Sequence, residues 1–228
     1  MRNRVFRLCC LLASVLLRPM ANLDLVDLDS KIVRGKGLII VANHRSVMDI
    51  LVGLALFRHW GVAPRMFVKA TYFAVPVVGQ LLRLMRAIPA SRDNARETMR
   101  TALRTLAEGG VVALAPEGRV LRAADRDDGV GDLRTGVGRL AAEFGSPIIA
   151  VGITNTDAVW PLGARRPRIR ARKASRPTVR VAVAQLDVEK GTSVAVVMAR
   201  LRSVLSQVVE TAEKAVGSGP SLDRPSAT

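Results

Sequence analysis

The chain has 228 residues, a length that fits one domain with a full hydrophobic core. It carries 35 lysines and arginines against 19 acidic residues, and the net charge of +16 favours nucleic acid, anionic lipid or a phosphorylated substrate as partners. An aromatic content of 4% argues against single-stranded nucleic acid, whose binding needs stacking platforms. A compositional bias towards arginine is the alternative explanation for part of the charge. The adjacent cysteines, Cys9 and Cys10, disfavour a disulfide and indicate a reducing compartment.

The N-terminal segment combines arginines with a largely apolar run from Leu8 to Leu17 that carries no charged residue. This run is far shorter than the roughly 20 residues that cross a bilayer. We expect residues 1–20 to form a short amphipathic helix that lies in the membrane interface, with its arginines at lipid headgroups. The alternative is a terminal helix that packs on the core. Residues 22–36 are mixed and polar, and no strand or helix is predicted there.

A strand, a turn and a helix are predicted around His44. The apolar run Leu38–Val41 indicates a buried strand, and Ser46 is the predicted N-cap of a helix that ends near Phe57. His44 and Asp49 are five residues apart, a spacing that puts them on different faces of one helix. They can meet only if His44 lies in the turn before the helix.

A carboxylate that reaches back to this imidazole would hold one ring tautomer. The other ring nitrogen would then be free to take a proton from a substrate hydroxyl. We therefore single out His44 as a general base and Asp49 as the group that orients it. Two alternatives remain open: Asp49 as the acidic member of an S-x-x-D helix start, and His44 as a structural residue of a turn. His59, at the predicted helix end, is interpreted as structural.

The next segment predicts a strand at 65–70, a short helix around 77–85 and a short strand at 86–90. Ser91 is the predicted cap of a helix over 92–107, which ends before two glycines. Arg92 therefore lies at a junction between strand and helix, beside free backbone N–H groups. Anions bind in such places.

Residues 111–115 predict a central strand that leads directly into Pro116, Glu117, Gly118 and Arg119. The glycine lets a ligand approach the backbone closely, and the arginine can donate two charge-assisted hydrogen bonds to a phosphate. Both features suit the mouth of a phosphate pocket. A simple surface turn is the alternative.

The remaining chain predicts a surface loop at 121–134, strands at 147–153 and 178–185, and a helix over 193–215. An edge position is one option for the strand at 178–185. Gly136 and Gly138 match a dinucleotide fingerprint, but a loop precedes them where a strand is required, so they are predicted to start a close-packed helix. The basic run from Arg165 to Arg176 is either a solvated loop or a lipid-facing surface. The tail, 217–228, has the composition of disorder.

These patterns predict an α/β fold: a mixed, largely parallel sheet of six or seven strands flanked by helices. They contain no G-x-S-x-G elbow, no phosphate loop and no paired metal-ligand spacing. We expect no metal and no cofactor. A single base with anion-binding neighbours suits direct attack by a substrate hydroxyl on an activated acyl group.

Taken in order, these blocks resemble the glycerolipid acyltransferase family, whose best-known members acylate 1-acyl-glycerol-3-phosphate. The resemblance covers residues 36–186. NHRSVMD is similar to the N-H-x4-D block of the family, RAIPASR to its second block, APEGR to its P-E-G block and SPIIAVGI to its fourth. In the third block, Arg119 stands where the family usually has threonine, and Val120 stands where it has arginine.

The resemblance implies that His44 deprotonates the hydroxyl of a lysophospholipid, which attacks the thioester of acyl-CoA or acyl carrier protein. It implies phosphatidate as the product and places Arg92, Glu117 and Gly118 at the acceptor, with Arg119 or Arg122 as the source of further positive charge. Because Glu117 is negative, we expect it to orient a hydroxyl or an arginine more than the phosphate itself. The expected domain spans 21–216, at the cytoplasmic face of the membrane on anionic lipid and without nucleic acid. A different lysolipid acceptor is one alternative, and a non-enzymatic basic protein that binds lipid headgroups or nucleic acid is another.

Overall fold

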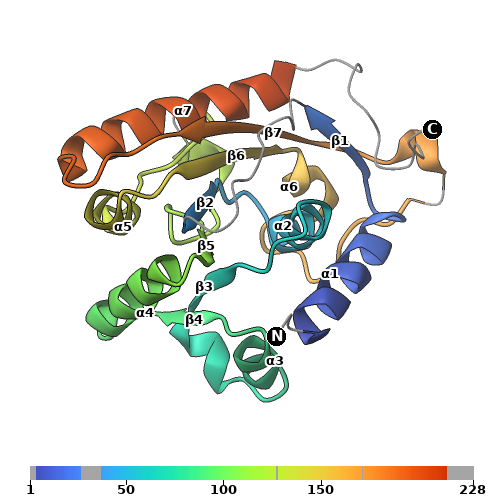
Figure 1. The fold of residues 1–228 in the computed structure, drawn as a ribbon. Coiled ribbons are helices and arrows are strands. Elements are labelled where there is room, and N and C mark those ends of the chain that lie inside the picture. Colours follow the sequence, from blue (N-terminus) through green and yellow to red (C-terminus); the bar gives the residue numbers. More distant parts are fainter. Residues whose placement is uncertain (1–3, 27–36, 127, 171, 215–228) are drawn as a thin grey trace, which may run out of the picture.

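Seven strands form one mixed sheet in the computed structural model, which describes residues 4–26, 37–126, 128–170 and 172–214 (Figure 1). In spatial order the strands are β1 (Asn22–Val26), β7 (Thr178–Leu186), β6 (Ile148–Thr154), β2 (Leu38–Ala42), β5 (Val111–Leu114), β3 (Arg65–Lys69) and β4 (Ile88–Ala90). Neighbouring strands are parallel, except for the antiparallel pair of β6 and β7. The predicted fold class, an α/β protein with a largely parallel sheet, is therefore confirmed.

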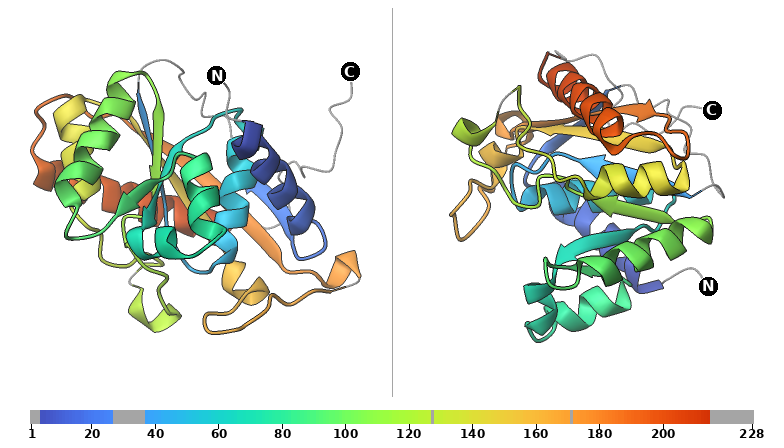
Figure 2. Two further views of the ribbon diagram at one scale, coloured as in Figure 1. Left: turned by 90° about the horizontal axis from the view of Figure 1, so that it is seen from below. Right: turned by 90° about the vertical axis from the view of Figure 1, so that its left-hand side faces the viewer.

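Helices cover both faces of the sheet, as Figures 1 and 2 show. The helices are α1 (Arg4–Leu17), α2 (Met48–His59), α3 (Val78–Leu84), α4 (Ala95–Ala107), α5 (Gly136–Phe144), α6 (Thr156–Val159) and α7 (Val194–Lys214), with 3₁₀ turns η1 (Ala70–Ala74), η2 (Ala123–Asp125) and η3 (Lys173–Ser175). One core lies under α1 and α2 and includes Phe6 and Val52, and the other lies under α4, α5 and α7 and includes Leu106 and Leu205. Because both faces are covered, every residue of β6 is buried.

The sheet differs from the sequence-based prediction at one side. Residues 22–26 form a strand, β1, where none was expected, and β1 takes the edge position next to β7. The strand at 178–186 is therefore internal and not at an edge. The pattern of β1 is weak because only Leu25 of its five residues is buried, and its strand conformation depends on pairing with β7. The opposed Asp24 and Arg180 form an ion pair across the two strands, 3.5 Å apart.

Two helices begin later than predicted. α2 begins at Met48, because the Ser46 hydroxyl accepts the Met48 N–H inside a tight turn. α4 begins at Ala95 and not at Arg92, because the side chain of Asn94 accepts hydrogen bonds from the Ser91 N–H and hydroxyl and holds residues 91–94 in a turn. His59 is the last residue of α2, in agreement with its structural interpretation.

Helix α1 has one buried and one exposed apolar face. Four residues of α1 are buried: Phe6, Cys10, Ala13 and Leu17. The centroid of the Phe6 ring lies 6.3 Å from that of Phe57 in α2. Five further apolar side chains of α1 are exposed: Leu8, Leu11, Leu12, Val15 and Leu16. The helix therefore packs on the core, and it also presents an apolar face to its surroundings.

No helix within the described ranges combines the length and the apolar character needed to cross a membrane. The predicted disordered tail, 217–228, lies outside the described residues, and so do the first three residues of the predicted interface segment.

Candidate active site

The loop after β2 carries His44 out at the carboxyl edge of the parallel strands. The side chain of the preceding residue, Asn43, anchors the loop: its Nδ2 donates to the Ile153 carbonyl at 2.9 Å, and its Oδ1 accepts the Ile153 N–H at 2.7 Å. This pair of bonds extends the pairing of β2 and β6 by one residue. His44 therefore leaves the sheet at a fixed point, at the edge where α/β proteins bind their ligands.

His44 and Asp49 are in direct contact, as the spacing predicted. Nδ1 of His44 lies 2.8 Å from Oδ2 of Asp49. The carboxylate can only accept, so the hydrogen sits on Nδ1 and the second ring nitrogen, Nε2, is left as an acceptor. The histidine side chain is 21% exposed and the aspartate side chain 6%, which leaves the ring open to a substrate and the acid sheltered.

Four hydrogen bonds hold the Asp49 carboxylate. Besides the imidazole, Oδ2 accepts the backbone N–H groups of Arg45 at 2.6 Å and Ser46 at 2.7 Å. Oδ1 accepts the hydroxyl of Thr156, from the start of α6, at 2.5 Å. The two interpretations of Asp49 are thus compatible, because one carboxylate both closes the turn before α2 and orients the ring.

Glu117 supports the backbone of the histidine. It is 5% exposed, its Oε2 accepts the His44 N–H at 2.7 Å, and its Oε1 accepts the Gly131 N–H at 3.0 Å. Burial raises the pKa of this carboxyl, while the two N–H donors act in the opposite direction. The carboxylate therefore joins the histidine turn to the loop at 131, and both of its oxygens face backbone donors.

Gly118 lies under a guanidinium group. Its φ is +69°, and a Cβ added there would lie 2.6 Å from Nε of Arg134. Glu117, Arg119 and Arg134 line a small cavity of about 220 Å³, together with Asp125 and Asp132. Arg119 itself is exposed. The P-E-G segment thus forms one wall of a charged cavity next to the histidine turn.

Replacing Gly118 by alanine should disturb this cavity beyond the strain of the backbone. An alanine at positive φ costs about 1 kcal/mol of unfolding free energy, and the added methyl group must also displace Arg134. The matched control is Gly163→Ala, where φ is +85° and no atom lies within 4 Å of the added Cβ. Urea unfolding should show similar losses of unfolding free energy for both variants, whereas only Gly118→Ala should raise KM for the lysophospholipid acceptor that the sequence predicts. Equal KM values for the two variants would mean that this wall of the cavity does not bind the acceptor.

Arg92 lies in the exposed turn between β4 and α4. Because β4, β3, β5 and β2 are parallel neighbours, this turn is at the same sheet edge as His44, three strand spacings or about 14 Å along it. The edge therefore brings Arg92 towards the site without placing it beside the histidine.

Three residues that sequence reasoning missed complete the site: Asn43, Thr156 and Arg134. Asn43 precedes the histidine directly, so its position was a usable signal. Thr156 is 107 residues from Asp49 in sequence, and no local pattern connects the two.

The two glycines that match a dinucleotide fingerprint have a structural role. Gly136 and Gly138 begin α5 after a loop, and Gly138 packs against Met198 of α7, in agreement with a close-packed helix. Among the described residues, no three side chains of His, Cys, Asp or Glu gather as metal ligands.

Comparison with known proteins gives consistent matches. The family model described as Acyltransferase matches residues 26–154, more than half of the chain. A chloroplastic 1-acyl-sn-glycerol-3-phosphate acyltransferase from Brassica napus is 25% identical over 154 residues, 66% of this chain and 42% of the relative. A probable 1-acyl-sn-glycerol-3-phosphate acyltransferase from Mycoplasma genitalium is 25% identical over 164 residues, 70% of this chain and 60% of the relative. The chain thus spans about two-fifths to three-fifths of the length of these relatives.

A solved structure shares the fold. The crystal structure of the 1-acyl-sn-glycerophosphate (LPA) acyltransferase PlsC from Thermotoga maritima matches with a TM-score of 0.73 and 18% identity. The match covers 93% of this chain and 81% of that one. The likeness therefore extends over the sheet and both helical layers.

Proposed function

Because the chain belongs to the acyltransferase family, we propose that it moves a fatty acyl group from acyl-CoA or acyl carrier protein to the free hydroxyl of a lysophospholipid. The acceptor we propose is 1-acyl-glycerol-3-phosphate, which gives phosphatidate, because the relatives from Brassica napus and Mycoplasma genitalium carry that activity in their names. The observation that carries the proposal is the contact between His44 and the buried Asp49. Family membership favours this proposal over the alternative of a non-enzymatic basic protein.

The proposed reaction needs one proton acceptor and no covalent enzyme intermediate. Nε2 of His44 takes the hydroxyl proton while the substrate oxygen attacks the thioester carbonyl. The tetrahedral intermediate collapses, the carbon–sulfur bond breaks, and the imidazolium returns the proton to the leaving thiolate. Asp49 stabilises the imidazolium and fixes the ring through the Nδ1 contact. Holding two substrates in line supplies much of the rate, and the step requires no cofactor.

The acceptor headgroup fits the charged wall beside the histidine. We assign phosphate binding to Arg119 and Arg92, two exposed arginines at this edge of the sheet. Gly118, which has no side chain, would let the headgroup approach the backbone closely. Glu117 supports the site by holding the His44 N–H. Val47 and Ile50 flank Asp49 and are 46% and 51% exposed, which offers an apolar path for the acyl chains.

A thiol-release assay tests the reaction. With an acyl-CoA donor, the purified chain should release CoA thiol only when lysophosphatidate is present. Release that is equally fast without any acceptor would indicate a thioesterase and contradict acyl transfer. If lysophosphatidate fails, a panel of other lysophospholipids with the same donor distinguishes the alternative acceptor from the absence of transfer.

The exposed apolar face of α1 supports a location at a membrane. Arginines flank this face, and a lysophospholipid substrate resides in the bilayer, so we propose a peripheral or monotopic position on anionic lipid. Cys9 and Cys10 are both free thiols. Free thiols fit a reducing compartment, and we therefore assign the enzyme to the cytoplasmic face, with residues 21–216 as its catalytic domain.

A further inference from the structure

The segment from η1 to α3, residues 70–84, exposes an apolar surface that the acyl-transfer site does not use. We propose that this segment is a second membrane-contacting element, which docks on an anionic bilayer together with α1. The exposure, backbone conformation and charge of the segment all favour this docking, whichever acceptor the enzyme uses.

The segment presents its apolar side chains outwards. All of its residues are described, and Gly79 alone among them is buried, against the backbone of Phe73. The exposed apolar side chains are Tyr72, Val75, Val77, Val78, Leu81 and Leu84. Scattered exposed apolar residues are ordinary, but six of them within one segment of fifteen residues indicate a contact surface.

A strained turn holds the most prominent of these side chains outwards. Val77 has φ 64° and ψ −56°, and the Val78 N–H donates to the Pro76 carbonyl at 2.7 Å. These values define a γ-turn of the rare type, and a positive φ is costly for a β-branched residue. Val77 is also 78% exposed. Strain that places a valine in water needs a compensating gain, and burial in lipid supplies one.

The charge around the segment selects an anionic bilayer as its partner. The sequence has no aspartate or glutamate between residues 50 and 92, and Lys69, Arg83 and Arg86 border the apolar set. The first acidic residue of the chain is Asp24, so α1 lies in a similarly acid-free stretch. A second copy of this chain, also at +16, would be repelled, whereas anionic lipid is attracted.

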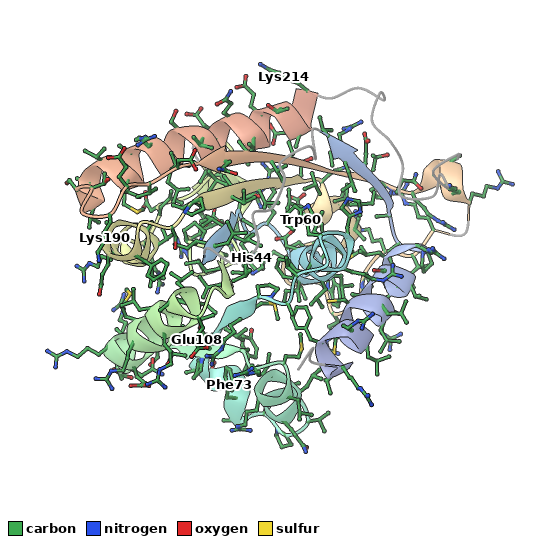
Figure 3. All side chains as sticks on the ribbon, in the orientation of Figure 1. His44, Trp60, Phe73, Glu108, Lys190 and Lys214 are labelled. Carbon is green, nitrogen blue, oxygen red and sulfur yellow. The ribbon has the colours of Figure 1, made fainter. Side chains whose placement is uncertain are left out.

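The two elements lie on the same side of the molecule. In Figure 1 both α1 and α3 lie in the lower part, beyond α2, while α7 runs across the top. Figure 3 places Phe73 in this lower part and Lys214 at the far end. A bilayer on this side can therefore receive both apolar surfaces, while α7 remains in solution.

Sedimentation of the full chain with phosphatidylglycerol–phosphatidylcholine vesicles tests the proposal through Val77→Asn. Asparagine accepts a positive φ better than valine does, so the melting temperature should stay equal or rise. Vesicle partitioning should fall about tenfold, the effect of losing one buried valine side chain. The matched control is Val196→Asn, an exposed valine on α7, which should partition as the unchanged chain does.

Three results would overturn the proposal. The first is a Val77→Asn variant that melts higher and partitions unchanged, which makes the turn merely structural. The second is failure of the unchanged chain to bind these vesicles, and the third is a Val77-dependent dimer by light scattering, which assigns the surface to a second copy. Both variants and the unchanged chain should transfer acyl groups equally fast to a short-chain, water-soluble lysophosphatidate. If none of the three transfers acyl groups to this acceptor, the proposed reaction is wrong, and the vesicle results still decide the membrane contact.

Discussion

Replacing His44 by alanine should lower kcat for acyl transfer by about two to four orders of magnitude, the usual contribution of a general base. The ring is partly exposed, and within the described part of the chain its side chain is hydrogen-bonded to Asp49 alone. The loop around it is held by backbone bonds, from the His44 N–H to Glu117 and from the Leu121 N–H to the His44 carbonyl. We therefore expect the circular dichroism spectrum and the unfolding midpoint to change little.

The chain contains a matched control for this variant. His59 is the only other histidine, and it lies exposed at the end of α2, a full helix away from the site. His59→Ala should keep full activity. A His44→Ala variant that folds and retains the activity of the unchanged chain would remove the imidazole from the mechanism.

Replacing Asp49 by asparagine should damage both the reaction and the fold. The Oδ2 atom accepts three N–H groups, and an amide nitrogen in its place would face donors. An unsatisfied buried donor costs about 1–3 kcal/mol, so the free energy of unfolding should fall by about 2–4 kcal/mol. In either orientation the amide is neutral, so the imidazolium loses its counter-charge and kcat should fall about a hundredfold or more.

Thr156→Val separates these two effects. This variant removes one hydroxyl bond to Oδ1 and leaves the carboxylate charge and its three N–H partners in place. It should cost about 1 kcal/mol of stability and reduce kcat far less than Asp49→Asn does. If both variants lose stability equally and keep equal activity, Asp49 acts only as a helix-start residue, and the orienting role is wrong.

Local patterns predicted most elements because each depends on neighbours in sequence. The continuous apolar runs of β2 and β6 indicate strands that are buried on both faces. The 3.6-residue period of apolar residues in α7 indicates a helix with one buried face. The prediction that His44 stands in a turn and can meet Asp49 also came from local features, namely the five-residue spacing, the apolar run before the histidine and the predicted cap at Ser46. Errors fell where tertiary context decides, as at β1, whose few apolar residues become a strand only beside β7.

By itself, the sequence singled out His44 and Asp49 and predicted how they could meet, because five residues between a strand and a helix leave a histidine and an acid one way to come into contact. It also determined the class of fold. Only the tertiary structure decided what holds that pair: Glu117 reaches the His44 backbone across 73 residues, and Thr156 reaches Asp49 across 107. These bonds depend on which strands are neighbours, and strand order is set by packing of the whole sheet, which no local pattern encodes.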